Sequence, residues 1–596
     1  MTSAKSAQVT PSQESGLTSF KIKNFKGVGE WQEVPLKPIT LVFGKNSAGK
    51  STILHALAYI HDLLFQGIVN QILPSKGKGF INLGGLRQII HFNSKGEQEK
   101  ELGFSFCFSF DKKDLNKKIV NFLEEIEKAL KNSLKTTNDT TNKEKVEKRI
   151  EAVKACAENS EKILNNALGL DEKEPNIKYE IRLVINCDEF LKTESKFNQF
   201  DRKPEVSILI DEKLIITFDS NKKDTTEKTD LFKVEGTKEY SNRIENLLSQ
   251  LGEMSQCVFL DEEFYKKISE SYIAPIFCQD PRSDKRLTKL LKDIKPVLDQ
   301  IGSAILLASL RLTPNRTRIF PFQPNPIFKM NGLQEITKNA SSVEFDKLFL
   351  SICTLLFSEI LCHLGETARD YLHGFLRGVR YLEGIRYSPD RFINQYNLLK
   401  EKNEEGKSSL LSYNDLFKNK EVFQKTNEAL AHLGADFAIE IEKGNKDLGD
   451  SLLIKKNNRR LSFKDIGFGW SQVVPVLVEA YAEDNSILCC EQPELHLHPS
   501  AQSELMSILA CKRDKEKSPR LLLEAHSEQM IIRLLRLIRD KKISKADCAI
   551  LYVLPAKSGP EESNDVKFKI ITPDTDGRIG EQWPEDFFES GMRDLL

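Results

Sequence analysis

The sequence predicts an α/β fold in which a mixed sheet with flanking helices is split by a large, mostly helical insertion. Near the N-terminus a strand, a glycine-rich loop and a helix follow one another between residues 33 and 66. Strand and helix patterns alternate again from Asp436 to the end, whereas apolar residues at helical spacing dominate 226–400. The 596 residues, 40% of them hydrophobic, suffice for one large domain or several ordinary ones.

The bulk composition narrows the class of protein. Basic residues number 87 and acidic residues number 87, so we exclude coating of nucleic acid by bulk charge, although not a local basic face. The 11 cysteines form no CxxC pair, which is typical of a reducing compartment. No run of about 18 apolar residues occurs, and the N-terminus shows no signal-peptide pattern. We therefore expect a cytoplasmic protein with no membrane segment.

The chain divides by pattern into seven segments. After Asp111 apolar residues recur every three or four positions, a polar break follows, and a second amphipathic run begins near Val146. This pattern predicts an inserted helical hairpin that acts as a lid or an interaction arm. The expected segments are a flexible tail (1–18), the N-terminal half of the main domain (19–110), the helical hairpin (111–170), a β-rich part of the main domain (171–225), the helical insertion (226–400), a connecting loop and helix (401–435) and the C-terminal half of the main domain (436–596).

The segment "GKNSAGKS" (Gly44–Ser51) matches the phosphate-binding pattern G-x-x-x-x-G-K-[ST] in full, with a strand before it and a helix after it. Gly44 and Gly49 permit backbone dihedrals and a close approach that a Cβ would prevent. Successive N–H groups then bind phosphate oxygens at the N-terminus of the helix. We expect Lys50 to reach the β- and γ-phosphates and the Ser51 hydroxyl to join the shell of a Mg²⁺ ion. The motif predicts ATP and Mg²⁺ as cofactors.

Three segments near the C-terminus extend this pattern. "GFGWSQVVPVLVEAY" (Gly467–Tyr481) places glycines and a serine before a helix. "SILCCEQPELHLHP" (Ser486–Pro499) is an apolar strand that ends in an acid shortly before a proline. In "PRLLLEAHSEQMIIRLL" (Pro519–Leu535) an apolar strand ends at Glu524, and His526 precedes the next helix.

Together with "FKIKNFKGV", "FGKNSAGKST", "YLEGIRYSPDRF" (Tyr381–Phe392) and "DGRIGEQWPEDFF", these segments make the chain similar to the ABC-like AAA ATPases of the RecF, SMC and OLD group. It most resembles bacterial members found in phage defence, such as the ATPases of Septu and retron-linked systems. The likeness covers 19–110 and 375–596 and implies the fold of a P-loop ABC-type ATPase head. Relatives tend to carry a proline before the residue pair that ends in Arg386, and this chain has Gly384, which leaves the local turn open.

The resemblance implies a role for each motif. Glu491 takes the Walker B position that holds Mg²⁺ through water, with Ser51 as the other metal residue. His526 resembles the switch histidine that senses the γ-phosphate, His498 lies near the D-loop, and Gln88 is a candidate for the Q-loop glutamine. The expected nucleotide contacts are the Walker A residues Gly44, Lys45, Asn46, Ser47, Ala48, Gly49, Lys50, Ser51 and Thr52 and, from a second subunit, the signature-loop residues Gly467, Gly469, Ser471 and Gln472.

Position 492 raises a question about hydrolysis. ABC ATPases generally carry glutamate there, whereas Gln492 can hydrogen-bond a water but cannot take its proton. Glu494 can take a proton, and it faces the same side as Gln492 if the chain stays extended past that residue. The expected catalytic residues are therefore Glu491, Gln492, Glu494 and His526, with hydrolysis that is slow or triggered by a partner.

The implied function is a nucleotide-controlled switch. ATP is expected to lie between two heads, so a homodimer or a higher oligomer is the default assembly. No E-G-x-x-E pattern of a Toprim nuclease follows Asp547, so we expect an effector protein, a nuclease or toxin encoded nearby, to carry the chemistry of anti-phage defence. Two alternatives stay open: a RecF-like DNA-repair ATPase that acts directly on DNA, and a non-hydrolysing scaffold held together by ATP.

Other polar clusters have simpler interpretations. His496 and His498 have one carboxylate near them, which makes no convincing metal site. The segment "PDTDG" (Pro573–Gly577) is better explained as a turn than as a pair of metal ligands. One proline-rich stretch interleaves basic and aromatic residues, a pattern that suits direct contact with DNA or RNA. We favour a structural loop as its interpretation. Its basic residues are Arg311, Arg316 and Arg318.

Overall fold

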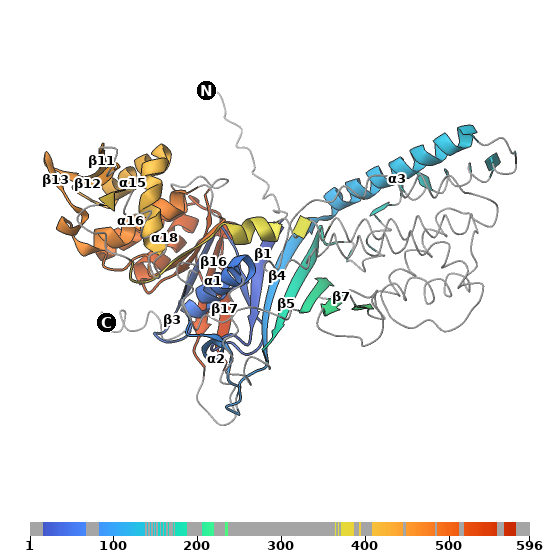
Figure 1. The fold of residues 1–596 in the computed structure, drawn as a ribbon, viewed down its shortest axis with the longest axis horizontal. Coiled ribbons are helices and arrows are strands. Elements are labelled where there is room, and N and C mark those ends of the chain that lie inside the picture. Colours follow the sequence, from blue (N-terminus) through green and yellow to red (C-terminus); the bar gives the residue numbers. More distant parts are fainter. Residues whose placement is uncertain are drawn as a thin grey trace.

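The computed structural model describes residues 16–66, most of 81–187, short strands between 205 and 236, most of 364–386, Ile393–Asn394, and 408–579 apart from short gaps. Two sheets lie beside each other with helix α1 between them, and helix α3 projects away from both (Figure 1). Most of 226–400, for which the sequence predicts helices, lies outside the described residues. The three arginines of the basic stretch lie in this part of the chain.

The main sheet has six strands in the order β17-β16-β3-β15-β14-β9. All neighbouring pairs are parallel except β16 and β17, which confirms the predicted mixed sheet. Its strands come from both ends of the chain, as expected for a domain split by a long insertion. The bounds are β3 (Ile39–Gly44), β9 (Val379–Leu382), β14 (Ile487–Glu491), β15 (Arg520–Glu524), β16 (Cys548–Leu554) and β17 (Lys567–Ile571).

Helices cover both faces of the main sheet, which explains why its central strands β3, β14 and β15 are almost wholly buried. Leu41 and Phe43 of β3 belong to a core cluster shared with α16, α17 and α18. Val42 between them is buried outside that cluster, since successive side chains of a strand point to opposite faces. The helices are α1 (Ser51–Gln66), which contacts β9, β14 and β15, and α16 (Phe468–Tyr481), α17 (Pro499–Cys511) and α18 (Glu528–Arg539).

The second sheet has seven strands in the order β2-β1-β4-β5-β6-β7-β8, each pair antiparallel. The ring of Tyr59 on α1 lies 5.8 Å from that of Phe25 and 6.0 Å from that of Phe104. Aromatic contacts therefore hold α1 against this sheet. The bounds are β1 (Gly16–Lys23), β2 (Gln32–Pro35), β4 (Glu101–Asp111), β5 (Asn176–Asn186), β6 (Glu205–Ile210), β7 (Lys213–Asp219) and β8 (Lys233–Gly236).

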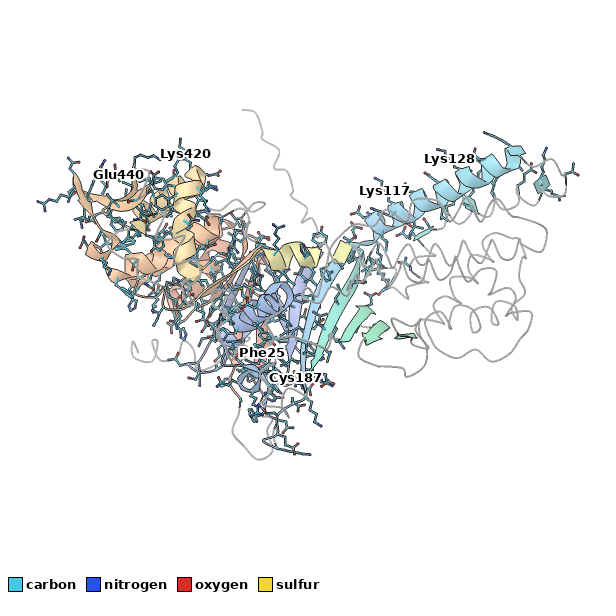
Figure 2. The ribbon with its side chains drawn as sticks, viewed as in Figure 1. Phe25, Lys117, Lys128, Cys187, Lys420 and Glu440 are labelled. Carbon is cyan, nitrogen blue, oxygen red and sulfur yellow. The ribbon has the colours of Figure 1, made fainter. Side chains whose placement is uncertain are left out.

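Helix α3 (Lys112–Thr136) follows β4 directly, as the change of period after Asp111 predicts. Leu115, Ile119 and Leu123 are buried on one face, and Figure 2 shows Lys117 and Lys128 along the same helix. In the second amphipathic run Ile150 and Val153 are buried, and the Lys154 ammonium lies 3.9 Å from the Glu127 carboxylate of α3. The described residues of this run thus pack back on α3.

A small third sheet joins β10, β12, β11 and β13 and packs with α14 and α15 beside α16. Its elements are β10 (Ile393–Asn394), α14 (Ser408–Lys418), α15 (Lys420–His432), β11 (Ala438–Glu442), β12 (Ser451–Lys456) and β13 (Arg459–Leu461). The remaining short helices are α2 (Leu86–Ile89), η3 (Phe463–Asp465) and η4 (Lys545–Asp547).

Two boundaries differ from those the sequence predicts. The strand expected over 33–44 is two strands, β2 and β3, in different sheets, because Pro35 and Pro38 lack the N–H that a continuous ladder needs. Val379–Leu382, which falls inside the expected insertion, is the edge strand β9 of the main sheet. Within the described part of the chain, no helix combines the length and apolarity needed to cross a membrane.

Candidate functional site

The predicted phosphate loop connects β3 to α1 in conformations that glycine permits. Gly44 has φ of +153° and Gly49 has φ of +94°, and Ser47 between them also has a positive φ of 60°. A Cβ on Gly44 would lie 2.5 Å from the carbonyl oxygen of Val553 on β16, so no other residue fits there. The loop leads into the N-terminus of α1, where the N–H groups of the first turn bind anions.

Lys50 closes this loop on itself. Its ammonium donates to the carbonyl oxygens of Gly44 (3.0 Å) and Lys45 (2.8 Å), and the residue is only 3% exposed. Burial lowers the pKa of Lys50, and the nearby carboxylates of Glu524 and Glu494 partly offset that effect. Both of these acceptors are neutral carbonyl oxygens. A phosphate would offer the ammonium a negatively charged acceptor in their place, and such a hydrogen bond is stronger. The glycine cradle and the buried cation therefore fit the phosphates of a nucleotide.

Glu491 ends β14, and three donors hold its carboxylate. The Tyr381 hydroxyl donates to it at 2.7 Å, Nε2 of His55 lies 3.0 Å away, and the backbone N–H of Gly384 also donates. Burial alone would raise the pKa of Glu491, but the hydrogen bonds from His55 and Tyr381 lower it. The other ring nitrogen of His55 lies 2.5 Å from the Lys26 ammonium. Glu491 is thus an ionised, positioned carboxylate, which suits a water-mediated Mg²⁺ contact.

The chain does not stay extended after Glu491. Gln492 has a left-handed φ of +44°, and its N–H donates to the carbonyl oxygen of Glu524 (2.8 Å). Pro493 cannot continue the strand ladder because it has no N–H. Glu494, 6% exposed, accepts a hydrogen bond from the backbone N–H of His526 (2.6 Å). Burial raises the pKa of Glu494, although that hydrogen bond opposes the effect.

Arg386 lies fully buried beneath this turn. Its contacts show how the chain runs at Gly384, where the sequence left the local turn open. Its guanidinium donates to the carbonyl oxygens of Glu491 and Gln492, and it lies 3.0 Å from Sγ of Cys490. A Cβ on Gly384 would meet Oε2 of Glu491 at 3.4 Å. The local turn is therefore built around the Walker B strand end.

The signature-like loop presents its glycines and an aromatic ring. Gly467 caps α16, and Phe468 is 47% exposed, with its ring 5.0 Å from that of His496. A Cβ on Gly469 would lie 2.5 Å from the carbonyl oxygen of His496. Glycine at 469 is therefore required for the contact between this loop and the turn after β14.

Ser471 and Gln472 point into their own subunit. Ser471 is 2% exposed and donates to the carbonyl oxygen of Phe468 at 2.7 Å. Gln472 is fully buried and binds the main chain of Arg386 in both directions, accepting at 2.8 Å and donating at 3.0 Å. The structure does not present these two side chains to a nucleotide on a second subunit, because both are engaged in internal hydrogen bonds.

Glu524 and His526 stand at the carboxyl end of β15, between the phosphate loop and Glu491. In the sheet register Glu524 lies opposite Val42 of β3 and Glu491 of β14. Glu524 is 4% exposed, and its Oε2 has no hydrogen-bond partner among the described residues. Nε2 of the half-exposed His526 lies 3.8 Å from Oε1 of Glu524. Parallel strands thus gather the predicted site residues at one edge of the sheet.

The remaining candidates lie elsewhere. Nδ1 of His498 lies 2.9 Å from the Ser500 hydroxyl at the start of α17. Asp574 accepts backbone N–H groups from Asp576 and Arg578, which confirms the turn. Across the described segments, no group of three or more histidine, cysteine, aspartate or glutamate residues could hold a metal. Gln88 is exposed on α2, and its Q-loop role stays a prediction.

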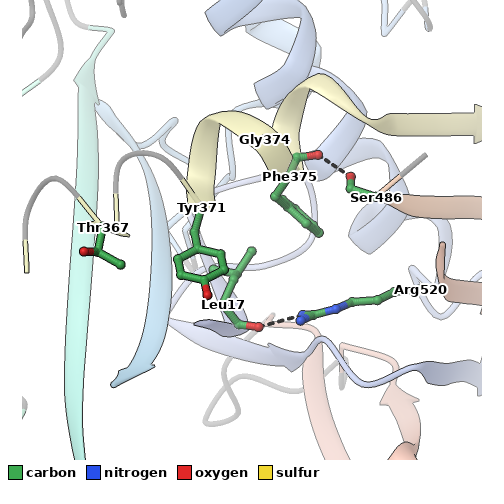
Figure 3. Close-up of a pocket in the computed structure, with 7 residues that line it drawn as sticks. All are labelled: Leu17, Thr367, Tyr371, Gly374, Phe375, Ser486 and Arg520. Atoms are coloured by element: carbon green, nitrogen blue, oxygen red, sulfur yellow. Dashed lines mark hydrogen bonds between the residues drawn. The ribbon is translucent and has the colours of Figure 1, made fainter. Parts of the chain in front are cut away.

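A separate pocket of about 530 Å³ lies at the opposite edge of the main sheet, at the amino ends of β14 and β15 (Figure 3). The Arg520 guanidinium donates to the carbonyl oxygens of Leu17 (2.6 Å) and Leu36 (2.9 Å), and Ser486 donates to the carbonyl oxygen of Phe375. These polar groups serve hydrogen bonds between strands and helices. Because the pocket lies at the edge opposite the phosphate loop, it is no part of the site described above.

Sequence reasoning did not single out His55, Tyr381 or Glu524 as site residues. A signal existed for His55, because it follows Ser51 by four residues and shares its helix face. Glu524 is an acid that ends an apolar strand, which is a weaker signal. Tyr381 begins the motif "YLEGIRYSPDRF", which supports the resemblance, but the motif lies in the segment assigned to the insertion and assigns no role to the tyrosine.

Comparison with known proteins agrees with these observations at the level of the family. A family model described as an AAA ATPase domain matches residues 16–531. No curated protein matches the chain.

Similar solved structures include an Smc head domain with an extended coiled coil from Pyrococcus furiosus, bound to the C-terminal domain of ScpA. It is 11% identical, the alignment covers 98% of this chain and 99% of that chain, and the TM-score is 0.33. The SMC head domain from Thermotoga maritima is 8% identical over 94% of this chain and 99% of that chain, with a TM-score of 0.32. The fold is defined by the sheet order and the phosphate loop rather than by these alignments. The family match over most of its length shows that the chain belongs to the AAA ATPase domain family.

Proposed function

We propose that this protein binds ATP with Mg²⁺ at Gly44–Ser51, hydrolyses the ATP slowly and acts as a nucleotide-controlled dimeric switch. The main support is the buried Lys50 ammonium inside a cradle that only glycine allows, with Glu494 and Glu524 acting on it electrostatically. Family membership supports ATP as the nucleotide.

In this proposal Lys50 exchanges its two carbonyl acceptors for phosphate oxygens, so the cation is already in place when ATP arrives. Ser51 and Glu491 are the residues that would hold Mg²⁺, whose charge neutralises the phosphates when it is bound. His55 and Tyr381 orient Glu491 from behind. His526, half-exposed beside Glu524, is available to the γ-phosphate side of the site.

The dimeric part of the proposal uses the exposed start of α16. Because Ser471 and Gln472 are buried, the contact with the partner's nucleotide falls to the backbone at Gly467 and Gly469 and to the ring of Phe468. ATP would then join two heads, and its hydrolysis would release them.

We further infer that the switch works in the cytoplasm of a bacterium, in anti-phage defence, where it controls a partner effector such as a nuclease or toxin. The support for this part is the likeness of "EQPELHLHP", "EAHSE" and "GFGWSQVVPVL" to the motifs of defence ATPases. A plaque assay of cells that carry the gene with its neighbours, in wild-type and Lys50→Ala form, tests it. Equal plaque counts with the wild-type genes and with an empty vector would exclude the defence role.

Nucleotide binding is tested with a fluorescent ATP analogue and Mg²⁺. We expect Lys50→Ala to weaken binding by about 100-fold, equivalent to about 3 kcal/mol. Lys37→Ala is the matched control, because it removes the same charge at the exposed amino end of β3. Light scattering with and without ATP reports the dimer. Equal affinity of Lys50→Ala and the control would contradict the assignment of the site.

A further inference from the structure

We propose that Glu524 is the general base of this ATPase, accepting the proton of the water that attacks ATP; this inference rests on the proposed function. It assigns to β15 the carboxylate that position 492 of the Walker B segment does not supply.

The position of Glu524 in the sheet is the first support. It is the last residue of β15, the strand between the phosphate-loop strand β3 and the Walker B strand β14. Register places it beside Val42, two residues before Gly44, and beside Glu491. Glu524 therefore lies between the phosphate loop and the carboxylate of Glu491. Its negative charge acts on the Lys50 ammonium and favours the protonated form of that lysine.

The burial of Glu524 is the second support. The residue is 4% exposed, Oε2 has no hydrogen-bond partner among the described residues, and Oε1 has His526 at 3.8 Å. A buried oxygen without a hydrogen-bond partner destabilises the folded state, and more so when the group is charged. Such a cost is typical of a functional site, where the free acceptor meets its donor only when substrate is bound.

The neighbouring side chains are less suited to this role. Glu491 is occupied by Tyr381, His55 and the Gly384 amide. Gln492 has no basic atom. Glu494 also has a free buried oxygen, but its other oxygen holds the backbone N–H of His526, and that contact ties it to the loop after β15.

The chemical step is a single displacement. The water oxygen forms a bond to the γ-phosphorus, the bond from that phosphorus to the β–γ bridging oxygen breaks, and ADP leaves with the electron pair. One water proton passes to Glu524 while the other stays on the phosphate, and Glu524 then releases its proton to solvent. Lys50 stabilises the charge that develops on the phosphate oxygens.

The test compares Glu524→Gln with wild type in the full chain, using single-turnover ATP hydrolysis, ATP affinity and the lifetime of the ATP-held dimer. Loss of a general base slows hydrolysis by about 10²–10⁴-fold. We expect ATP affinity within about threefold of wild type and a longer-lived dimer, because uncleaved ATP keeps the heads together. Glu528→Gln is the matched control: it removes a carboxylate four residues later, in the first turn of α18, to which the proposal assigns no role.

Glu524→Asp guards against a folding defect, since it keeps the carboxylate and should recover part of the rate lost in Glu524→Gln. Hydrolysis by Glu524→Gln within about threefold of the control would overturn the proposal. Loss of ATP binding in Glu524→Gln would also overturn it, because Glu524 would then serve binding. Wild-type protein that binds ATP without cleaving it would instead refute the proposed hydrolysis, and the base with it.

Discussion

The substitution Arg386→Met tests how the turn after β14 is held. Methionine keeps much of the apolar stem of arginine but removes the donors to the carbonyl oxygens of Glu491 and Gln492. Each buried carbonyl left without a partner costs about 1–3 kcal/mol. The variant also removes a buried charge whose Nε has no partner in the described part of the chain, which recovers part of that loss. We expect a net loss of about 3 kcal/mol in the free energy of unfolding.

Urea unfolding followed by tryptophan fluorescence measures this loss, because Trp470 sits in the same helix as Gln472, which binds the Arg386 main chain. Arg380→Met is the control: this arginine on β9 is 44% exposed in its side chain and lies 3.9 Å from Glu479, so we expect a change below about 0.5 kcal/mol. If Arg386→Met lowers the free energy of unfolding no more than the control does, the claim that Arg386 holds the turn after β14 is refuted.

Two further substitutions probe the same region. Gly469→Ala places a Cβ 2.5 Å from the carbonyl oxygen of His496, so we expect a loss of about 1–3 kcal/mol in urea unfolding. Gly374→Ala, which meets nothing within 4 Å, should be neutral or stabilising, and equal behaviour of the two would contradict the close contact. Glu494→Gln should change the pH dependence of stability. Burial raises the folded-state pKa of Glu494 above its usual 4.5, so the folded state holds this proton more tightly and wild type loses stability as pH rises through that window. The variant should not lose stability in this way as the pH rises. Identical curves of unfolding free energy against pH for the two proteins, from pH 4 to 8, would show that ionising Glu494 does not destabilise the folded state.

The phosphate loop shows how much a short pattern can determine. Its requirements are the φ values of Gly44 and Gly49, a lysine at 50 and a helix that begins at Ser51, and all of them lie within eight consecutive residues. The change of period after Asp111 also predicted the start of α3, because the spacing of apolar residues is a property of neighbouring residues. The path after Glu491 was different, since Gln492 adopts a left-handed φ that depends on its contact with β15.

The sequence by itself determined the α/β class, the nucleotide loop and the order of the motifs, because local backbone and hydrogen-bond demands encode them. Only the tertiary structure decided how the three carboxylates near this loop are held. Glu491, Glu494 and Glu524 are alike in type, and strand order and hydrogen-bond partners separate them. Three donors hold the first, a backbone N–H holds one oxygen of the second, and one oxygen of the third has His526 at 3.8 Å. These differences arise from His55, Tyr381 and His526, whose approach depends on how distant segments of the chain pack together.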